Sequence, residues 1–68
     1  MEIVLNNRDE KFEGVNKMTV QELLDAKKFS FKFLVVKING KVFTPDEYDN
    51  AVIYDGDKVT VLHLISGG

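Results

Sequence analysis

The sequence carries one clear helix signal, which lies between stretches whose composition is typical of β-strands. Thr19 is followed three positions later by Glu22, which is a capping box: the Thr19 side chain can accept from an early helix amide while Glu22 reaches back. The apolar residues that follow share one helical face: Val20, Leu23 and Leu24. Lys27-Lys28 then place positive charge where the helix dipole favours it. We therefore predict a helix over residues 20–28 with one face to bury.

The stretches on either side of this helix indicate two hairpins. Residues 2–5 form a short apolar run, and Asn6 to Asp9 suit a tight turn before strand-like residues 10–14. Residues 34–39 are apolar and β-branched enough for a central strand, and Asn39-Gly40 is a strong turn dipeptide. We predict one hairpin before the helix and a second one after it.

The last third of the chain completes the sheet. Pro45 to Tyr48 is typical of a single helical turn, because proline is tolerated at the first helical position, and Asp55-Gly56-Asp57 indicates another turn. The final strand is predicted from Lys58 to about Ile65. The order is ββαββ with a short helical turn before the last strand, so we expect one α+β domain over residues 1–68 with the helix on one sheet face.

Alternation with a period of two assigns the strand residues to the two faces of this sheet. The residues predicted to face the helix are Ile3, Leu5, Val36, Ile38, Val59 and Val61. The opposite phase contains apolar residues that the helix cannot cover, together with Thr60: Val4, Val35, Leu62 and Leu64. Exposed apolar patches on a small soluble protein mark binding surfaces, so we predict a docking surface on this side.

Composition excludes several classes of partner and of chemistry. The formal net charge is −2, and the nine Lys and Arg residues form no basic stripe, so nucleic acid is not expected as a partner. The absence of cysteine removes disulfides, thiolate metal ligands and a cysteine nucleophile, and it favours a reducing, cytoplasmic location. We also expect no signal peptide, because Met1 leads straight into a short apolar run, and no membrane span.

Conventional catalytic residues are nearly absent. His63 is the only histidine, and no second ligand or catalytic partner for it is evident. Ser30 and Ser66 lack an activating neighbour. Asp55 and Asp57 fit a turn, and the further ligands of a calcium loop are missing. We therefore expect that the chain is not an enzyme and that it holds no metal.

The remaining candidate is the tail Ile65-Ser66-Gly67-Gly68, which follows an apolar strand. Two glycines make a thin, flexible segment that can enter a narrow channel of another protein. An α-carboxyl titrates at about pH 3.5, so it is ionised in the cell and can attack the α-phosphate of ATP to give an acyl adenylate that accepts sulfur. The alternative is a frayed terminus where small residues happen to fall.

Taken together, these features resemble the ThiS family, the ubiquitin-like sulfur carriers of thiamin biosynthesis, over the entire chain. The residues that carry the resemblance are the N-terminal strand, Thr19-Val20 with Glu22-Leu23-Leu24, Val36-Lys37-Ile38-Asn39, the Pro45 to Tyr48 turn, Asp55-Gly56-Asp57 and Gly67-Gly68. The resemblance implies a β-grasp fold with a mixed sheet. It also implies a protein that is monomeric on its own and binds no cofactor.

The resemblance implies partners as well. A ThiF-type, E1-like enzyme would adenylate Gly68 with MgATP, a cysteine-desulfurase persulfide would supply sulfur, and a ThiG-type thiazole synthase would receive it from the thiocarboxylate. Gly67 would accompany Gly68 in the activating site. The exposed side of the last strand would dock these partners, through Val4, Thr60, Leu62, Leu64, Ile65 and Ser66.

Two alternatives stay open from the residues. The first is a MoaD-type carrier for molybdopterin synthesis, which shares the fold and the tail chemistry; the short length and the Ile65-Ser66 lead-in favour ThiS. The second is a β-grasp interaction domain whose glycines do nothing chemical. Phe29, Phe31 and Phe33 form an alternating aromatic run that the family does not require, and we expect at least one of them to anchor the core.

Overall fold

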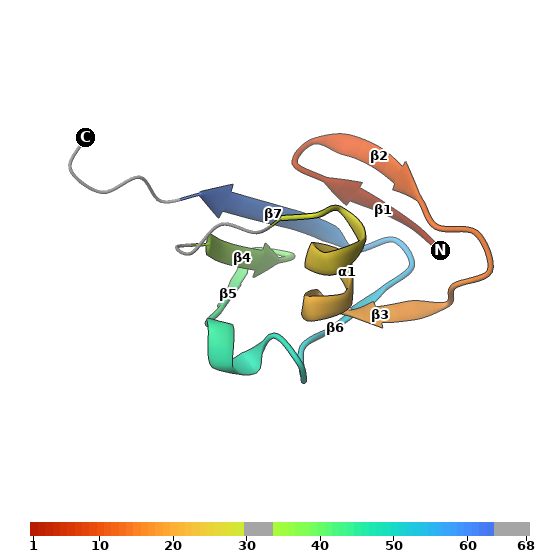
Figure 1. The fold of residues 1–68 in the computed structure, drawn as a ribbon. Helices are drawn as coiled ribbons and strands as arrows, with labels where there is room; N and C mark the ends of the chain where they lie inside the picture. Colours follow the sequence, from red (N-terminus) through yellow and green to blue (C-terminus); the bar gives the residue numbers. More distant parts are fainter. Residues whose placement is uncertain (30–33, 64–68) are drawn as a thin grey trace.

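The computed structural model describes residues 1–29 and 34–63, and Figure 1 shows how their elements are arranged. In chain order the elements are β1 (Glu2–Leu5), β2 (Arg8–Lys11), β3 (Lys17–Thr19), α1 (Val20–Ala26), β4 (Leu34–Ile38), β5 (Lys41–Phe43), the 3₁₀ turn η1 (Pro45–Glu47), β6 (Val52–Tyr54) and β7 (Lys58–His63). The predicted helical turn after Pro45 is thus confirmed, and the last two residues of the predicted final strand lie outside the described residues.

Five of the strands form one sheet, in the order β2-β1-β7-β4-β5. β1 and β7 run parallel, whereas the other neighbours are antiparallel, so the sheet is mixed. Helix α1 crosses one face of this sheet (Figure 1). The predicted fold class, an α+β β-grasp fold with one main helix on one sheet face, is confirmed.

The first hairpin is tighter than the sequence analysis predicts. Asn6 and Asn7 have φ values of 50° and 66°, and Leu5 pairs directly with Arg8. Asparagine tolerates the left-handed conformation better than most residues, so two of them complete a turn whose twist matches the strands. The prediction of a turn through Asp9 with a strand over 10–14 was therefore wrong, because β2 begins at Arg8.

Helix α1 begins where the capping box predicts and ends earlier. The Glu22 amide donates to Thr19 Oγ1 at 3.1 Å, and the Thr19 amide donates to Glu22 Oε1 at 2.8 Å. The predicted end at residue 28 was wrong: the helix stops at Ala26, and Lys28 has a φ of 59°. A residue in the left-handed region cannot continue a helix. Lys27 Nζ instead contacts Glu10 Oε1 of β2 at 2.9 Å.

The core lies between α1 and the sheet. All six residues predicted to face the helix are buried: Ile3, Leu5, Val36, Ile38, Val59 and Val61. The apolar face of the helix is buried against them, with Val20 and Leu23 completely inaccessible to solvent. Phe29 is half-buried and packs against this core, which confirms that one member of the aromatic run anchors it; Phe31 and Phe33 lie outside the described residues.

A second, two-stranded sheet supports the start of the helix, and the predicted order ββαββ omits it. β3 and β6 pair antiparallel, with Met18 opposite Ile53. Ile53 is fully buried. Backbone carbonyls of the chain that leads into β6 also accept hydrogen bonds from the first amides of the helix. The Val20 amide donates to the Ala51 carbonyl at 2.9 Å, and the Gln21 amide donates to the Tyr48 carbonyl at 3.0 Å.

The capping box yields a direct stability test. Thr19→Ala removes the hydroxyl that accepts from the Glu22 amide, so we expect the free energy of unfolding to fall by about 1 kcal/mol in denaturant titrations. Thr19→Ser keeps an acceptor at the same place and should lose little. Equal losses in the two variants would assign the effect to the pairing of β3, in which Thr19 also takes part.

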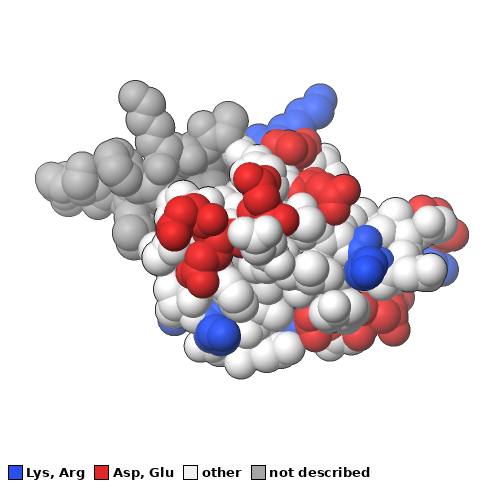
Figure 2. Space-filling view, turned by 90° about the horizontal axis from the view of Figure 1, so that it is seen from below, with Lys and Arg blue, Asp and Glu red and all other residues white. Residues whose placement is uncertain are grey.

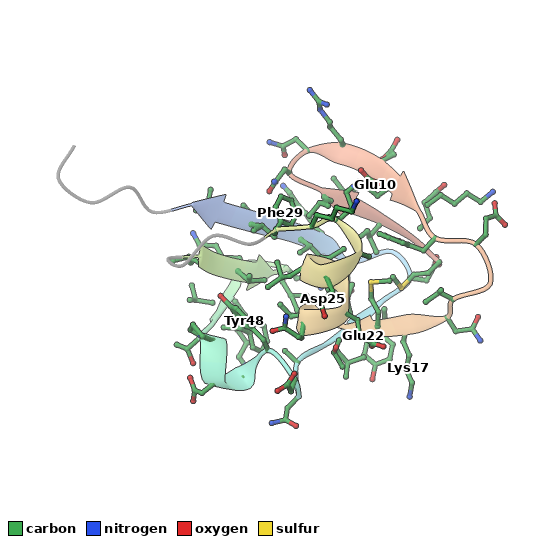
Figure 3. The ribbon with its side chains drawn as sticks, in the orientation of Figure 1. Glu10, Lys17, Glu22, Asp25, Phe29 and Tyr48 are labelled. Carbon is green, nitrogen blue, oxygen red and sulfur yellow. The ribbon has the colours of Figure 1, made fainter. Side chains whose placement is uncertain are left out.

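Tyr48 yields a prediction at alkaline pH. Its side chain is buried beside the helix on the side of η1 (Figure 3), and this burial raises the pKa of its phenol above 10.0. Because the folded-state pKa is the higher one, the contribution of the protonated phenol to stability is complete below the unfolded pKa and is lost as pH rises through the folded pKa.

We therefore expect wild type to lose unfolding free energy relative to Tyr48→Phe as pH rises above about 10, the unfolded-state pKa, toward the higher folded-state pKa. Denaturant unfolding at several pH values measures this difference. Tyr54→Phe, on the exposed surface of β6, controls for the loss of a phenol. Parallel pH curves for Tyr48→Phe and wild type would contradict the assignment.

Candidate functional site

The candidate site is built around β7, which lies at the centre of the main sheet. Strand residues alternate between the two faces, and every second residue of β1, β4 and β7 is taken up by the core. We call the other side the outer face, and the residues that define it are Val4, Val35, Lys37, Val42, Lys58, Thr60 and Leu62. Its centre lies on the strand that leads to residues 64–68.

Strand register brings these side chains together in rows. Leu62 of β7 is opposite Val35 of β4, and Thr60 is opposite Lys37, which is itself opposite Val42 of β5. Directly opposed Cβ atoms lie about 5 Å apart, so each row is a set of touching neighbours. The exposed large apolar side chains on this face are Leu62, at 43%, and Val42, at 51%. The outer face therefore offers a partner accessible apolar area next to a lysine.

Three of the predicted partner-binding residues lie where the alternation predicts. Leu62 is exposed, whereas Val4 and Thr60 are half-buried. Their position on the outer face is confirmed, and their role in binding stays a prediction. The other predicted site residues, Leu64, Ile65, Ser66, Gly67 and Gly68, lie outside the described residues.

The sequence analysis missed Val42 and Lys37 as members of this surface. A signal for both was present. Asn39 and Gly40 have φ values of 51° and 88°, so they form a two-residue turn that pairs Ile38 with Lys41. That register places Val42 opposite Lys37, one step from the turn, on the side of the sheet that the helix does not cover.

The charges of the protein are unevenly distributed. The outer face carries Lys37 and Lys58 on β4 and β7, whereas Asp9, directly opposite Val4, and Glu2 lie on the same side of the sheet toward β2. On the side of η1, in contrast, acidic side chains gather (Figure 2). The exposed acidic residues of α1, of η1 and of the turn after it are Glu22, Asp25, Asp46, Glu47 and Asp49. A partner of the outer face would thus meet apolar and basic groups over β4 and β7 and acidic groups toward β2.

The acidic side also has a hollow, of about 360 Å³, lined by Phe43, Asp46, Glu47, Asn50 and Ala51. Its carboxylates serve local structure, because Glu47 Oε1 accepts from the Thr44 amide at 2.9 Å and Asp46 accepts from the Thr44 hydroxyl. Within residues 1–29 and 34–63, no group of three or more His, Cys, Asp or Glu side chains could hold a metal ion.

In the part of the chain that the structure describes, no helix is both long and apolar enough to cross a membrane.

Comparison with known proteins agrees with this architecture. The model of the ThiS family matches residues 2–68. The crystal structure of the thiamine biosynthesis protein ThiS from Geobacter metallireducens is 30% identical in sequence, covers all of both chains and superposes with a TM-score of 0.90. An NMR solution structure of a thiamine biosynthesis protein from the same organism is also 30% identical, over all of this chain and 88% of the other, with a TM-score of 0.81. The chain belongs to the ThiS family.

Proposed function

We propose that this protein is a sulfur carrier of thiamin biosynthesis whose working group is the carboxylate of Gly68. The observation that carries the proposal is the match of residues 2–68, the two terminal glycines included, to the ThiS family. The fold supports it, because a chain with a TM-score of 0.90 to this one is a thiamine biosynthesis protein. Among the described residues, no three His, Cys, Asp or Glu side chains cluster as the metal site of an enzyme would require.

The proposed chemistry uses the backbone carboxylate as a nucleophile. One oxygen of the Gly68 carboxylate attacks the α-phosphate of MgATP in the active site of a ThiF-type enzyme, and pyrophosphate leaves, which gives an acyl adenylate. The terminal sulfur of a persulfide, formed by a cysteine desulfurase, then attacks the activated carbonyl carbon and AMP leaves. A thiol cleaves the remaining sulfur–sulfur bond, becomes part of a disulfide, and leaves the thiocarboxylate on Gly68.

The folded body has a different task in this proposal, which is recognition. The outer face would dock the activating enzyme and then the ThiG-type thiazole synthase, with Leu62 at its centre and Val4, Thr60, Leu64, Ile65 and Ser66 around it. A small mixed surface suits this exchange of partners, since a large apolar interface would hold one of them permanently. We place the cycle in the cytoplasm, where a persulfide and the thiols that reduce it coexist.

The first test follows the mass of the intact protein. Incubated with ATP and a ThiF-type enzyme, the wild type should gain one adenylyl group, and with a persulfide donor it should exchange one oxygen for sulfur. Deletion of Gly68 should abolish both changes and leave the thermal unfolding midpoint nearly unchanged, because a terminal residue contributes little packing.

A variant with one alanine added after Gly68 is the matched control, since it keeps both glycines but moves the carboxylate. It should fail in the same way. The proposal would be refuted if the deletion variant were still loaded with sulfur, or if the wild type never formed an adenylate with any ThiF-type enzyme.

The second test concerns the outer face. Leu62→Asp places a charge at the centre of the proposed interface, so we expect Kd for the ThiF-type enzyme to rise by about tenfold or more. Because Leu62 is already exposed, the free energy of unfolding should fall by less than about 1 kcal/mol. Titration and denaturant unfolding measure the two quantities.

Two controls surround this variant. Tyr54→Asp changes an equally exposed apolar residue on β6, away from the outer face, and should leave Kd unchanged. Val61→Asp changes the buried neighbour of Leu62 and should mainly lower stability. If Leu62→Asp instead resembled Val61→Asp, Leu62 would belong to the core and not to a docking surface.

A further inference from the structure

Strand β7 extends further along the sheet than one of its two neighbours. β4 pairs with β7 from Val59 to His63, whereas the parallel pairing with β1 covers only Lys58 and Val59. After Leu5 the chain turns back into β2, as Figure 1 shows at the start of the first hairpin. Within the described residues, the second half of β7 therefore has a strand on one side only.

One side chain continues the ladder on the open side. The Asn6 amide donates to the Val59 carbonyl at 2.9 Å, which is the last backbone bond between the hairpin and β7. The Asn6 side-chain Oδ1 then accepts from the Val61 amide at 2.8 Å, in a partly buried position. The amide oxygen of Asn6 thus occupies the place where a longer β1 would have supplied its next backbone carbonyl.

We propose that Asn6 is a positioning residue for the C-terminal tail: it fixes the direction in which β7 leaves the sheet, and so where the tail presents its carboxylate. The inference rests on the proposed function, in which Gly68 must reach the reaction centre of a partner. Val61 is the last residue of β7 that is held from both sides among the described residues, by β4 and by Asn6.

Seven residues follow Val61, so a small change of direction at Val61 can displace Gly68 by a large distance. The chain from Val61 to Gly68 can span at most about 25 Å, so a swing of about 20° at Val61 displaces its end by up to about 9 Å. Reacting atoms must come within about 3.5 Å of each other with the correct alignment. Restricting the swing before binding increases the fraction of carrier molecules that are ready to enter a partner's channel.

Few residues can satisfy both demands of this position. The backbone of Asn6 has a φ of 50°, which favours Gly, Asn and Asp, and its side chain must place an acceptor oxygen on Val61. Glycine meets only the first demand, and aspartate meets both. Asn7 is a natural control, because it also has a positive φ, of 66°, but its side chain makes no hydrogen bond within the described residues.

The first measurement is hydrogen exchange at the Val61 amide. Asn6→Gly removes the acceptor without straining the turn, so exchange at this amide should become at least about fivefold faster than in wild type. Asn6→Asp and Asn7→Gly should leave it close to the wild-type rate. All comparisons are made at a temperature where thermal unfolding shows each variant to be fully folded.

The second measurement reports tail direction without any partner enzyme. The chain has no cysteine, so Lys17→Cys and Ser66→Cys together provide the only two thiols for spin labels. Lys17 lies exposed on β3 and serves as the fixed reference. The distribution of label distances should broaden in Asn6→Gly and keep its width in Asn6→Asp and Asn7→Gly.

The third measurement separates positioning from mere structure. With the ThiF-type enzyme and ATP, Asn6→Gly should raise KM for the carrier by about fivefold while kcat stays nearly constant, because fewer carrier molecules present a competent tail. Asn6→Asp should restore the wild-type KM, and Asn7→Gly should retain it.

The outcomes distinguish this inference from the proposed function. An unchanged distance distribution in Asn6→Gly would overturn the positioning role, as would faster exchange at Val61 with an unchanged KM. If the wild type were never adenylated, the proposed function would fail, while the label distances would still decide whether Asn6 directs the tail.

Discussion

The structure depends on the burial of one helical face against one sheet face. Helix α1 has seven residues, which is too short to be stable in water by itself. It exists because its apolar face is covered by the sheet and because its first amides have acceptors, in the capping box and in the backbone carbonyls that precede β6. The same contact stabilises the sheet, since it removes Val36 and Val59 from water. With no cysteine available, packing of this kind must hold the fold.

This arrangement determines where a partner can bind. One helix covers one face of a five-stranded sheet, so the outer face is left for other proteins. Because β7 is the central strand of the sheet, its outward-facing residues have strands on both sides across the sheet, β1 and β4. The proposed docking surface around Leu62 and the proposed reactive group at Gly68 would thereby be joined through a single strand. The fold itself holds recognition close to the proposed chemistry.

Much of the fold could be predicted because its signals are local. The Thr19–Glu22 capping box and the alternation along β1, β4 and β7 each depend on neighbours in sequence. The pairing of β3 with β6 could not be found in this way, since each strand has three residues and their partnership is visible only once the chain has folded. Val42 was missed because its place on the outer face depends on register across the Asn39-Gly40 turn.

The contact between Asn6 and Val61 could not be predicted for a related reason, and it follows from the topology. Parallel strands run in the same direction, so β1 must turn back into β2 at the end of the sheet toward which β7 continues. A central strand that is also the exit of the chain therefore loses its parallel neighbour before it leaves. A longer β1 would close this gap, but its turn would then lie beside the start of the tail. One asparagine side chain, projecting from the turn, holds the strand at Val61 in place of that longer β1.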